Sequence, residues 1–444
     1  MPAPPGPKGG FFSAAASAFR RDQLGFYESS ARDYGDVVAT RMGPYRIWLV
    51  YHPDAIEELL VTRARDFVKS PGVRLMRPLL GDGLLLSEGD FWLRQRRLAQ
   101  PAFHRQRVAG YGQVMADFAE RHAAGWRDGA IVEVHGEMMA VTQAIVGKTL
   151  FDADVSGDAH DAAEAAKVLA EDFGARLASL SLRLLPAWVP TPGNLKARRA
   201  IRRLDAIVDR IIASRHASGE DRGDLLSMLM NAQDADDGTR MTPRQLRDEV
   251  MTIFLAGHET TAVALSWTWY LLALHAEVET RLAEELRAVL DGRVPTVADL
   301  PRLTYAANVV SESMRLFPPA YGIARQAVRA TELGGYPVDR QDIVIAPTWT
   351  VHRDHRWFDK PEEFRPERWA DDLARRLPRF AYFPFGGGPR QCIGNAFALM
   401  EATLILAVVA QRVRLSLVPG QRITPTPYVT LRPEPGIRMR VTRR

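Results

Sequence analysis

The only cysteine of the chain, Cys392, constrains its fold and chemistry more than any other residue. It lies in Phe385-Gly386-Gly387-Gly388-Pro389-Arg390-Gln391-Cys392-Ile393-Gly394. A lone cysteine is ordinarily a small, buried, apolar residue. Here three glycines and a proline predict a tight turn, in which no bulky side chain separates the backbone from a ligand. Arg390 adds a positive charge, and a helix is predicted after Gly394. We therefore expect a thiolate that can bind a metal.

A single thiolate limits the metal chemistry that the chain can support. Iron–sulfur clusters and cysteine-rich zinc sites need several cysteines, and this chain of 444 residues has one. One cysteine also excludes a disulfide framework. Thiolate ligation of a haem iron remains.

The cysteine segment resembles the haem-ligand signature of the cytochrome P-450 family, Phe-x-x-Gly-x-Arg-x-Cys-x-Gly, and matches every fixed position. The resemblance covers essentially the whole chain. It implies one mainly α domain over residues 1–444 with a small β region, a triangular helical fold with haem b (iron protoporphyrin IX) between the oxygen helix and the cysteine-loop helix. Residues 1–12 are rich in proline and are expected to be flexible. The resemblance implies that Cys392 binds the iron and that these residues contact the haem: Phe385, Gly386, Arg390, Ile393 and Gly394.

Two further segments match the family. Glu312-Ser313-Met314-Arg315 matches its Glu-x-x-Arg, and Phe364-Arg365-Pro366-Glu367-Arg368-Trp369 matches its Pro-Glu-Arg motif. Glu and Arg three residues apart also occur on many solvated helices, where the pair contributes little. The resemblance implies that Glu312, Arg315 and Arg368 form a buried, structural network that positions the cysteine loop, because buried charges must be paired.

A long apolar helix is predicted from about residue 243 to 275. Thr242-Pro243-Arg244-Gln245 has the pattern of a capping box with proline at the first helical position. The polar cluster Ala256-Gly257-His258-Glu259-Thr260-Thr261 interrupts this helix and weakens it. One explanation is a kink with locally satisfied hydroxyls.

The cluster also resembles the oxygen-binding motif of the family. Ala256 and Thr260 share a helix face. The resemblance implies that Thr260 hydrogen-bonds the bound dioxygen or its water, and that Glu259 connects that water to bulk protons. We therefore expect Glu259 and Thr260 to be catalytic, and we do not expect His258 to be a ligand.

Four residues match positions that bind haem propionates in the family. Trp92 and Arg96 fit its Trp-x-x-x-Arg and lie one helical turn apart, and Arg325 and Arg390 match further propionate-binding arginines. Any one of the 52 arginines could equally be a solvated surface charge.

The segments that face substrate in the family are mostly aliphatic here, which predicts an apolar substrate held by shape. Residues 71–87 contain two glycine turns and are expected to form a loop over the active site. The expected substrate contacts are Val73, Leu84, Leu85, Ile253, Ala256, Ala320, Tyr321, Ile323 and Val429.

The charge of the chain is moderately basic, with a net charge of +5. The arginines are spread along the sequence, so nucleic acid binding is not expected. Arg94, Arg97, Arg105 and Arg107 could form a docking face for an acidic electron-transfer protein or could be a solvated helix face. No signal peptide or membrane anchor is recognised, so we expect a cytoplasmic protein.

The leading hypothesis is a haem-thiolate monooxygenase that hydroxylates an apolar fatty acid, alkane, terpenoid or steroid-like molecule. No flavin or ferredoxin module is recognised. Electrons are therefore expected from a separate ferredoxin or flavodoxin and an NAD(P)H reductase. A peroxide-driven peroxygenase and a non-catalytic haem ligand-binding or sensor protein are the alternatives. The Glu259–Thr260 pair argues against both.

Overall fold

The computed structural model describes residues 3–8, 10, 14–154, 157, 159–179, 182, 186, 188–233 and 238–444. These residues are mainly helical with small β-sheets, as the sequence predicts. They divide into two compact units. Unit 1 comprises Met1–Arg74 and Ser311–Cys392, and unit 2 comprises Leu75–Val310 and Ile393–Arg444.

Unit 1 is built around a five-stranded sheet with the strand order β1-β2-β8-β5-β3. Strand β8 is parallel to β2, and the other neighbours are antiparallel. Trp48, Leu49 and Val344 are fully buried in its core. The elements of unit 1 are α1 (Ala14–Arg21), α2 (Gln23–Tyr34), β1 (Val37–Met42), β2 (Tyr45–Val50), α3 (Pro53–Glu57), η1 (Glu58–Thr62), η2 (Ala64–Asp66), β3 (Phe67–Lys69), β5 (Ile323–Ala327), β6 (Thr331–Leu333), β7 (Tyr336–Val338), β8 (Ile343–Ala346), α15 (Thr348–Val351), η7 (Pro366–Asp372), α16 (Leu373–Arg376) and η8 (Gly388–Arg390).

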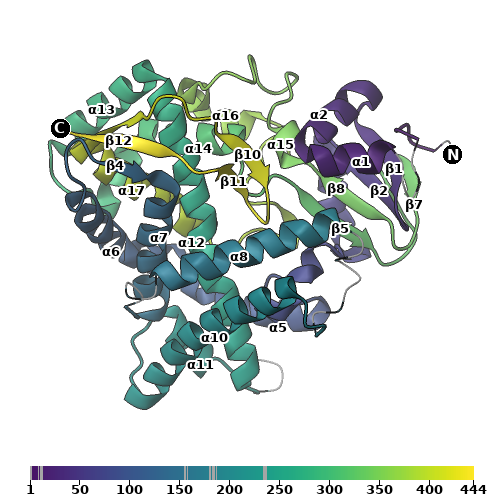
Figure 1. Ribbon diagram of the computed structural model, residues 1–444, viewed down its shortest axis with the longest axis horizontal. Coiled ribbons are helices and arrows are strands. Elements are labelled where there is room, and N and C mark those ends of the chain that lie inside the picture. Colours follow the sequence, from purple (N-terminus) through teal and green to yellow (C-terminus); the bar gives the residue numbers. More distant parts are fainter. Residues whose placement is uncertain are drawn as a thin grey trace. The chain divides into compact units, whose positions relative to one another are not determined.

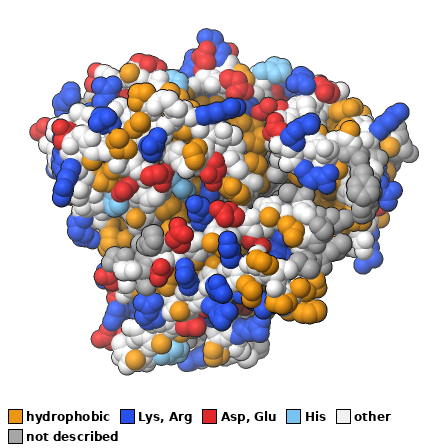
Figure 2. Space-filling model, viewed as in Figure 1, with side chains coloured by type: hydrophobic (Ala, Val, Ile, Leu, Met, Phe, Trp, Pro, Cys, Tyr) orange, Lys and Arg blue, Asp and Glu red, His pale blue; other side chains and the backbone are white. Residues whose placement is uncertain are grey.

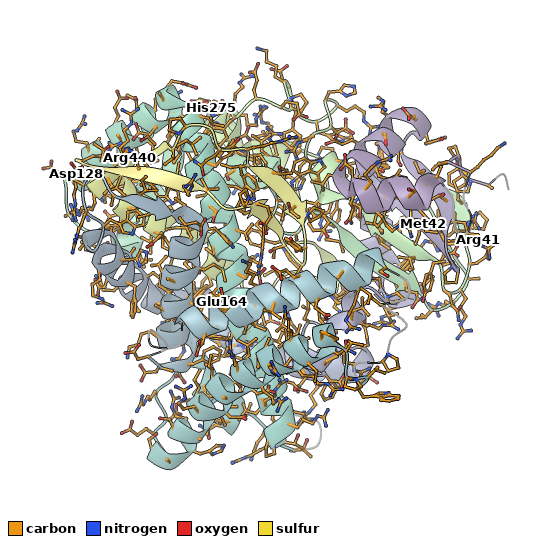
Figure 3. All side chains as sticks on the ribbon, in the orientation of Figure 1. Arg41, Met42, Asp128, Glu164, His275 and Arg440 are labelled. Carbon is orange, nitrogen blue, oxygen red and sulfur yellow. The ribbon has the colours of Figure 1, made fainter. Side chains whose placement is uncertain are left out.

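The N-terminal segment runs beside the first strand. Ala39 N donates to Pro5 O at 2.9 Å, Thr40 Oγ1 donates to Pro7 O at 3.0 Å, and Gly10 bridges Met42, the labelled end of β1 in Figure 3. The flexibility expected for residues 1–12 remains a prediction, because residues 1, 2, 9, 11 and 12 lie outside the described chain.

Unit 2 is mostly helical, with two small sheets near the end of the chain. Its elements are α4 (Arg77–Leu80), α5 (Gly89–Ala99), η4 (Gln100–Phe103), α6 (Arg105–Ala124), β4 (Ile131–Glu133), α7 (Val134–Phe151), α8 (Ala159–Ala178), α10 (Pro192–Ser218), α11 (Leu225–Asn231), α12 (Pro243–Leu274), α13 (Ala276–Leu290), η6 (Val297–Arg302), α17 (Asn395–Arg412), β9 (Val413–Leu417), β10 (Thr424–Pro427), β11 (Leu431–Glu434) and β12 (Arg438–Arg443). Helix η3 (Val73–Met76) and helix α14 (Thr304–Leu316) cross the boundary between the units.

Helix α12 organises unit 2, and it packs against α7, α10 and α17 (Figure 1). The predicted capping box is present: Thr242 Oγ1 accepts from Gln245 N at 3.2 Å, and Thr242 N donates to Gln245 Oε1 at 2.8 Å. These bonds satisfy two backbone donors that would otherwise be orphaned at the helix start. The helix ends at Leu274, one residue before the predicted end at His275, which Figure 3 labels.

The C-terminal strands complete unit 2. Strand β12 pairs antiparallel with both β4 and β9. The segment before β4 is tied to the central strand β12 through two residues labelled in Figure 3: Asp128 Oδ1 accepts from Arg443 N at 2.8 Å, and Arg440 Nη1 donates to Gly129 O at 3.1 Å.

One helix of the described residues, α17, is long and apolar enough to cross a membrane. Two thirds of it (67%) is buried within the protein, as is usual for a core helix.

Candidate functional site

The cysteine loop of unit 1 is closed by its own backbone. Cys392 N donates to Phe385 O at 3.0 Å, and Gln391 N donates to Gly388 O at 3.1 Å across η8. Gly386 and Gly388 both have positive φ angles, of 69° and 68°. A Cβ at Gly388 would overlap the carbonyl oxygen of Leu60, so only glycine fits there. The closed loop leaves Cys392 exposed.

The structure brings Glu312, Arg315 and Arg368 together in unit 1. Arg315 binds Glu312 through two hydrogen bonds of 2.9 Å, and neither side chain is exposed. Arg368 Nε donates to the same carboxylate at 2.8 Å, and Trp369 Nε1 donates to it at 2.9 Å. Each oxygen of the buried carboxylate therefore has two or more donors, which compensates for its lost hydration.

The network continues from Arg315 towards the cysteine loop through His352. Arg315 Nη1 donates to His352 O at 2.9 Å, and His352 Nε2 accepts from Phe383 N at 2.9 Å. Burial first, and the charges of Arg315 and Arg353 next, lower the pKa of His352 well below its usual value, so the ring is neutral and can accept this bond. Phe383 O in turn accepts from Gly386 N at 2.9 Å. His352 was not predicted, because a single histidine far from the motifs carries no sequence signal.

In unit 2, the polar cluster of α12 opens the helix to solvent. Ala256 is exposed and Thr260 is partly exposed, while Phe254 and His258 are fully buried. Thr260 Oγ1 donates to Ala256 O at 2.9 Å, one turn back along the helix. Ala256 and Thr260 thus place a methyl group and a hydroxyl on an accessible face of the helix.

Glu259 points to the C-terminal strands. Its Oε1 accepts from Thr430 Oγ1 at 2.8 Å and from Arg432 Nε and Nη2 at 3.1 and 2.8 Å. Burial alone would raise the pKa of Glu259, but the charge and hydrogen bonds of Arg432, with smaller effects from Thr430 and His258, lower it overall. The carboxyl group is therefore ionised near neutral pH. Thr430 and Arg432 were not predicted, since they lie about 170 residues away in the sequence.

Two histidines lie near this cluster. His258 directs Nδ1 to Phe254 O at 2.6 Å and packs on the Phe254 ring. His135 contacts Ser266 Oγ at 3.2 Å. Burial, and then the charge of Arg432, lower the pKa of His135 to about 4 despite Glu133 and Glu259 nearby, so it is neutral.

The residues predicted to bind haem propionates are held on regular elements. Trp92 and Arg96 are partly buried on α5 of unit 2, one turn apart. In unit 1, Arg325 lies on β5 and donates to Ala324 O at 3.1 Å, and Arg390 ends η8.

The predicted substrate contacts differ in exposure. Tyr321 is buried, and its hydroxyl faces Gln23 and Tyr27 of unit 1. The exposed members are Ala256 and Ala320, the buried members are Ile253 and Tyr321, and the partly exposed members are Val73, Leu84, Leu85, Ile323 and Val429.

The residues present fit a haem. The exposed thiol of Cys392 stands at the end of a loop fixed by backbone hydrogen bonds. Within the described parts of the chain, no three His, Cys, Asp or Glu side chains gather so that they could hold a metal ion. A single thiolate donor suits an iron whose other ligands come mainly from a porphyrin.

Comparison with known proteins also indicates a haem protein. The family model of cytochrome P-450 matches residues 4–441, and the chain belongs to this family of haem-binding monooxygenases. Its cofactor is haem b.

Several bacterial relatives match most of the chain. Cyclooctatin synthase of Streptomyces melanosporofaciens is 40% identical over 90% of this chain and 87% of its own length. Cyclooctat-9-en-7-ol 5-monooxygenase of the same organism is 37% identical over 87% of this chain and 84% of its own length. Pentalenene oxygenase of Streptomyces avermitilis is 33% identical over 94% of this chain and 92% of its own length.

Proposed function

We propose that this protein is a monooxygenase that hydroxylates an apolar terpenoid with dioxygen and two electrons. The observation that carries the proposal is the exposed thiol of Cys392 at the end of a backbone-closed loop. The terpenoid class is supported by the relatives, whose names include a pentalenene oxygenase and a cyclooctat-9-en-7-ol monooxygenase.

The haem, when bound, supplies the activation of dioxygen, and the protein supplies binding, orientation and protons. Cys392 would hold the iron. Trp92, Arg96, Arg325 and Arg390 would hold the propionates, because arginine matches the geometry of a carboxylate.

Thr260 and Glu259 would deliver protons to the site of oxygen chemistry. The Thr260 hydroxyl can turn from Ala256 O to a water or an oxygen atom in the exposed stretch of α12. Glu259 directly precedes Thr260 on the helix and is ionised, so it can take a proton from water at its own side and release it to a neighbouring water. A peroxygenase or a passive haem sensor has no need of such a relay.

The substrate would be held mainly by aliphatic side chains. Leu84, Leu85, Ile323 and Val429 are each partly exposed and offer no hydrogen bond. Such a lining favours a compact apolar molecule recognised by shape. We further propose a ferredoxin or flavodoxin with its NAD(P)H reductase as the electron source, and a cytoplasmic location.

The test is spectroscopic and chemical. The reduced carbon monoxide complex should show a strongly red-shifted Soret band that Cys392→His lacks. With a reductase, a ferredoxin and NAD(P)H, wild type should hydroxylate pentalenene or a related cyclic terpene. The amount of hydroxylated product should match the amount of NAD(P)H oxidised.

Thr260→Ala should keep haem and substrate binding but form hydrogen peroxide in place of product, because the hydroxyl that positions a proton is lost. Thr268→Ala, which removes a similar hydroxyl-to-backbone bond (Thr268 Oγ1 to Ala264 O, 2.8 Å) elsewhere on α12, should stay coupled. An unchanged Soret band in Cys392→His, or full coupling in Thr260→Ala, would remove the respective residue from the mechanism.

A further inference from the structure

Three consecutive side chains of α12 each bind a backbone group of the segment 79–84. Arg247 Nη1 donates to Leu79 O at 2.8 Å. Asp248 Oδ2 accepts from Asp82 N at 3.0 Å, and Glu249 Oε2 accepts from Leu84 N at 3.0 Å. The expected loop at 71–87 is therefore fixed at three points along its length, and α4 forms within it.

The loop approaches α12 too closely for side chains. A Cβ at Gly83 would overlap Thr252 Oγ1 and would lie 2.5 Å from the carbonyl oxygen of Asp248. Gly81 has a φ of 55°, which other residues adopt rarely, and its Cβ position is filled by the Asp248 carboxylate. These two glycines, which the sequence indicates only as turns, allow the backbone to lie directly on the helix.

Burying the carboxylates of Asp248 and Glu249 is unfavourable, because each loses its hydration. Asp248 is 5% exposed and Glu249 is fully buried. Arg247 pairs with Asp248 at 2.9 Å and also with Asp205 of α10. Glu249 has neutral donors, the Leu84 amide and Gln95 Nε2 at 2.9 Å. Burying a carboxylate among neutral donors costs several kcal/mol before its hydrogen bonds are counted.

What these bonds achieve is to fix one short piece of backbone. Leu84 carries the amide that Glu249 binds, and Leu85 follows it; both side chains are partly exposed and apolar. A side chain whose backbone is fixed presents a fixed shape to a ligand, so less entropy is lost on binding.

We propose that Asp248 and Glu249 are positioning residues for substrate recognition, which hold the backbone at Asp82 and Leu84 and thereby set the shape that Leu84 and Leu85 present to a bulky apolar ligand. The inference rests on the proposed function in that the loop must border the ligand pocket. It does not depend on which apolar compound is the substrate. Arg247 extends the same contact to α10 through Asp205.

The experiment uses the haem-loaded, full-length protein and two readouts. The first is hydrogen–deuterium exchange of the amides at 81–86, which needs no ligand. The second is equilibrium titration with imidazole and with 4-phenylimidazole, two nitrogen ligands of haem iron that differ by one bulky apolar ring.

Glu249→Met removes the acceptor of the Leu84 amide, whereas Glu249→Gln keeps one. In Glu249→Met we expect exchange at 81–86 to accelerate at least about tenfold, and the Kd for 4-phenylimidazole to rise about tenfold, as the loss of one buried hydrogen bond would allow. The Kd for imidazole should change less than about twofold. Glu249→Gln should restore both properties towards wild type.

Glu285→Met is the matched control. Glu285 accepts backbone amides from Tyr305 and Ala306 at the start of α14, so its loss removes the same kind of bond away from the loop. It should alter neither readout. If Glu249→Met does not take up haem, Asp248→Ala removes the bond at Asp82 and the same readouts decide.

Unchanged exchange at 81–86 would overturn the positioning role. Faster exchange with equal effects on both imidazoles would show that the loop does not shape the pocket, and would overturn the inference as well. Failure of the proposed function is distinct: it would appear as a wild type that lacks the thiolate Soret band or does not hydroxylate terpenes, whatever the exchange data show.

Discussion

At the level of single residues, Arg432 is the group that decides the charge of Glu259. It supplies two of the three hydrogen bonds to that carboxylate, and its side chain is more buried than that of Glu259, with 8% against 13% exposed. Removing one member of such a pair leaves the other as an uncompensated charge.

We therefore expect Arg432→Gln to raise the pKa of Glu259 and to change proton delivery. In wild type the lowered pKa keeps Glu259 ionised down to acidic pH. In the variant, the amount of product formed per NAD(P)H oxidised should fall as the pH drops from about 8 towards 5. The reason is that a larger fraction of Glu259 is protonated at the lower pH.

The matched control for this variant is Arg438→Gln, which removes an exposed arginine of β12. It should keep the wild-type pH profile. Identical profiles for Arg432→Gln and wild type would show that the ion pair does not govern the relay.

Glu312 is the second residue whose removal should have a large effect. Glu312→Ala leaves the fully buried Arg315 unpaired, at a cost of about 3–5 kcal/mol. Because that is a large part of a domain's stability, the variant should bind haem poorly and should unfold at a lower temperature. Absorbance at the Soret band per protein and thermal unfolding measure both effects.

Glu120→Gln provides the comparison for an exposed pair. Glu120 pairs with Arg412, and both side chains are about 30% exposed, so its loss should cost less than about 1 kcal/mol. A haem-replete, stable Glu312→Ala would mean that the buried network is not needed for the cysteine loop.

The sequence revealed those site residues that lie in compact motifs. Glu312 and Arg315 are three residues apart, so a local pattern identifies them, and the structure places Arg368 on the same carboxylate. Thr430, Arg432 and His352 were missed. Each contacts its partner across a long stretch of chain, and an isolated Arg or His in a strand or loop has no distinctive pattern.

At the level of elements, a local signal located the start of α12, because the capping box of Thr242 and Gln245 can be recognised in the sequence. The segment 71–87 was less predictable. It contains η3 and α4, and long-range bonds from Asp248 and Glu249 of α12 fix the backbone that follows them at Asp82 and Leu84; no local pattern indicates those bonds.

Glu249 gives α12 a pH-dependent contribution to stability. Burial has the largest effect on the pKa of Glu249 and raises it, and the neighbouring charge of Asp248 raises it further. The hydrogen bonds from Leu84 and Gln95 lower it, but the net result is a pKa of about 7 in place of 4.5. Between these values the folded state binds more protons than the unfolded state. The free energy of unfolding therefore falls as the pH rises from about 4.5 to 7 and is level above that.

Glu249→Gln should remove this contribution. Relative to wild type, the variant should gain stability as the pH rises through this window, by up to on the order of 3 kcal/mol. Thermal unfolding of both proteins between pH 5 and 8 measures the difference. Asp248 and Arg247 remain in both proteins, so their charges cancel in the comparison. A constant difference at all pH values would show that Glu249 does not titrate in this range.

At the scale of the molecule, the arginines are spread along the sequence rather than clustered in one segment. On the face shown in Figure 2, Lys and Arg side chains alternate with Asp and Glu. This arrangement suits steering of a protein partner by a few local charges better than binding of a long polyanion.

Two of the four arginines of the predicted docking face make hydrogen bonds within the protein. Arg94 donates to Thr239 Oγ1 at 2.9 Å, and Arg107 donates to Gly223 O at 3.2 Å, so both serve internal contacts. Arg97 and Arg105 are exposed at the end of α5 and the start of α6. Their exposure makes these two arginines candidates for contact with an acidic electron donor.

Reversing both charges should therefore slow reduction by an acidic ferredoxin. Charge steering weakens as salt shortens the Debye length to about 8–10 Å, so the wild-type rate should fall steeply with added salt. Arg97→Glu with Arg105→Glu should lower the rate at low salt and flatten this dependence. Arg202→Glu with Arg203→Glu makes the same charge change on α10 and should behave like wild type. Stopped-flow reduction under carbon monoxide measures these rates, and equal salt dependence in all three proteins would leave Arg97 and Arg105 as solvated surface charges.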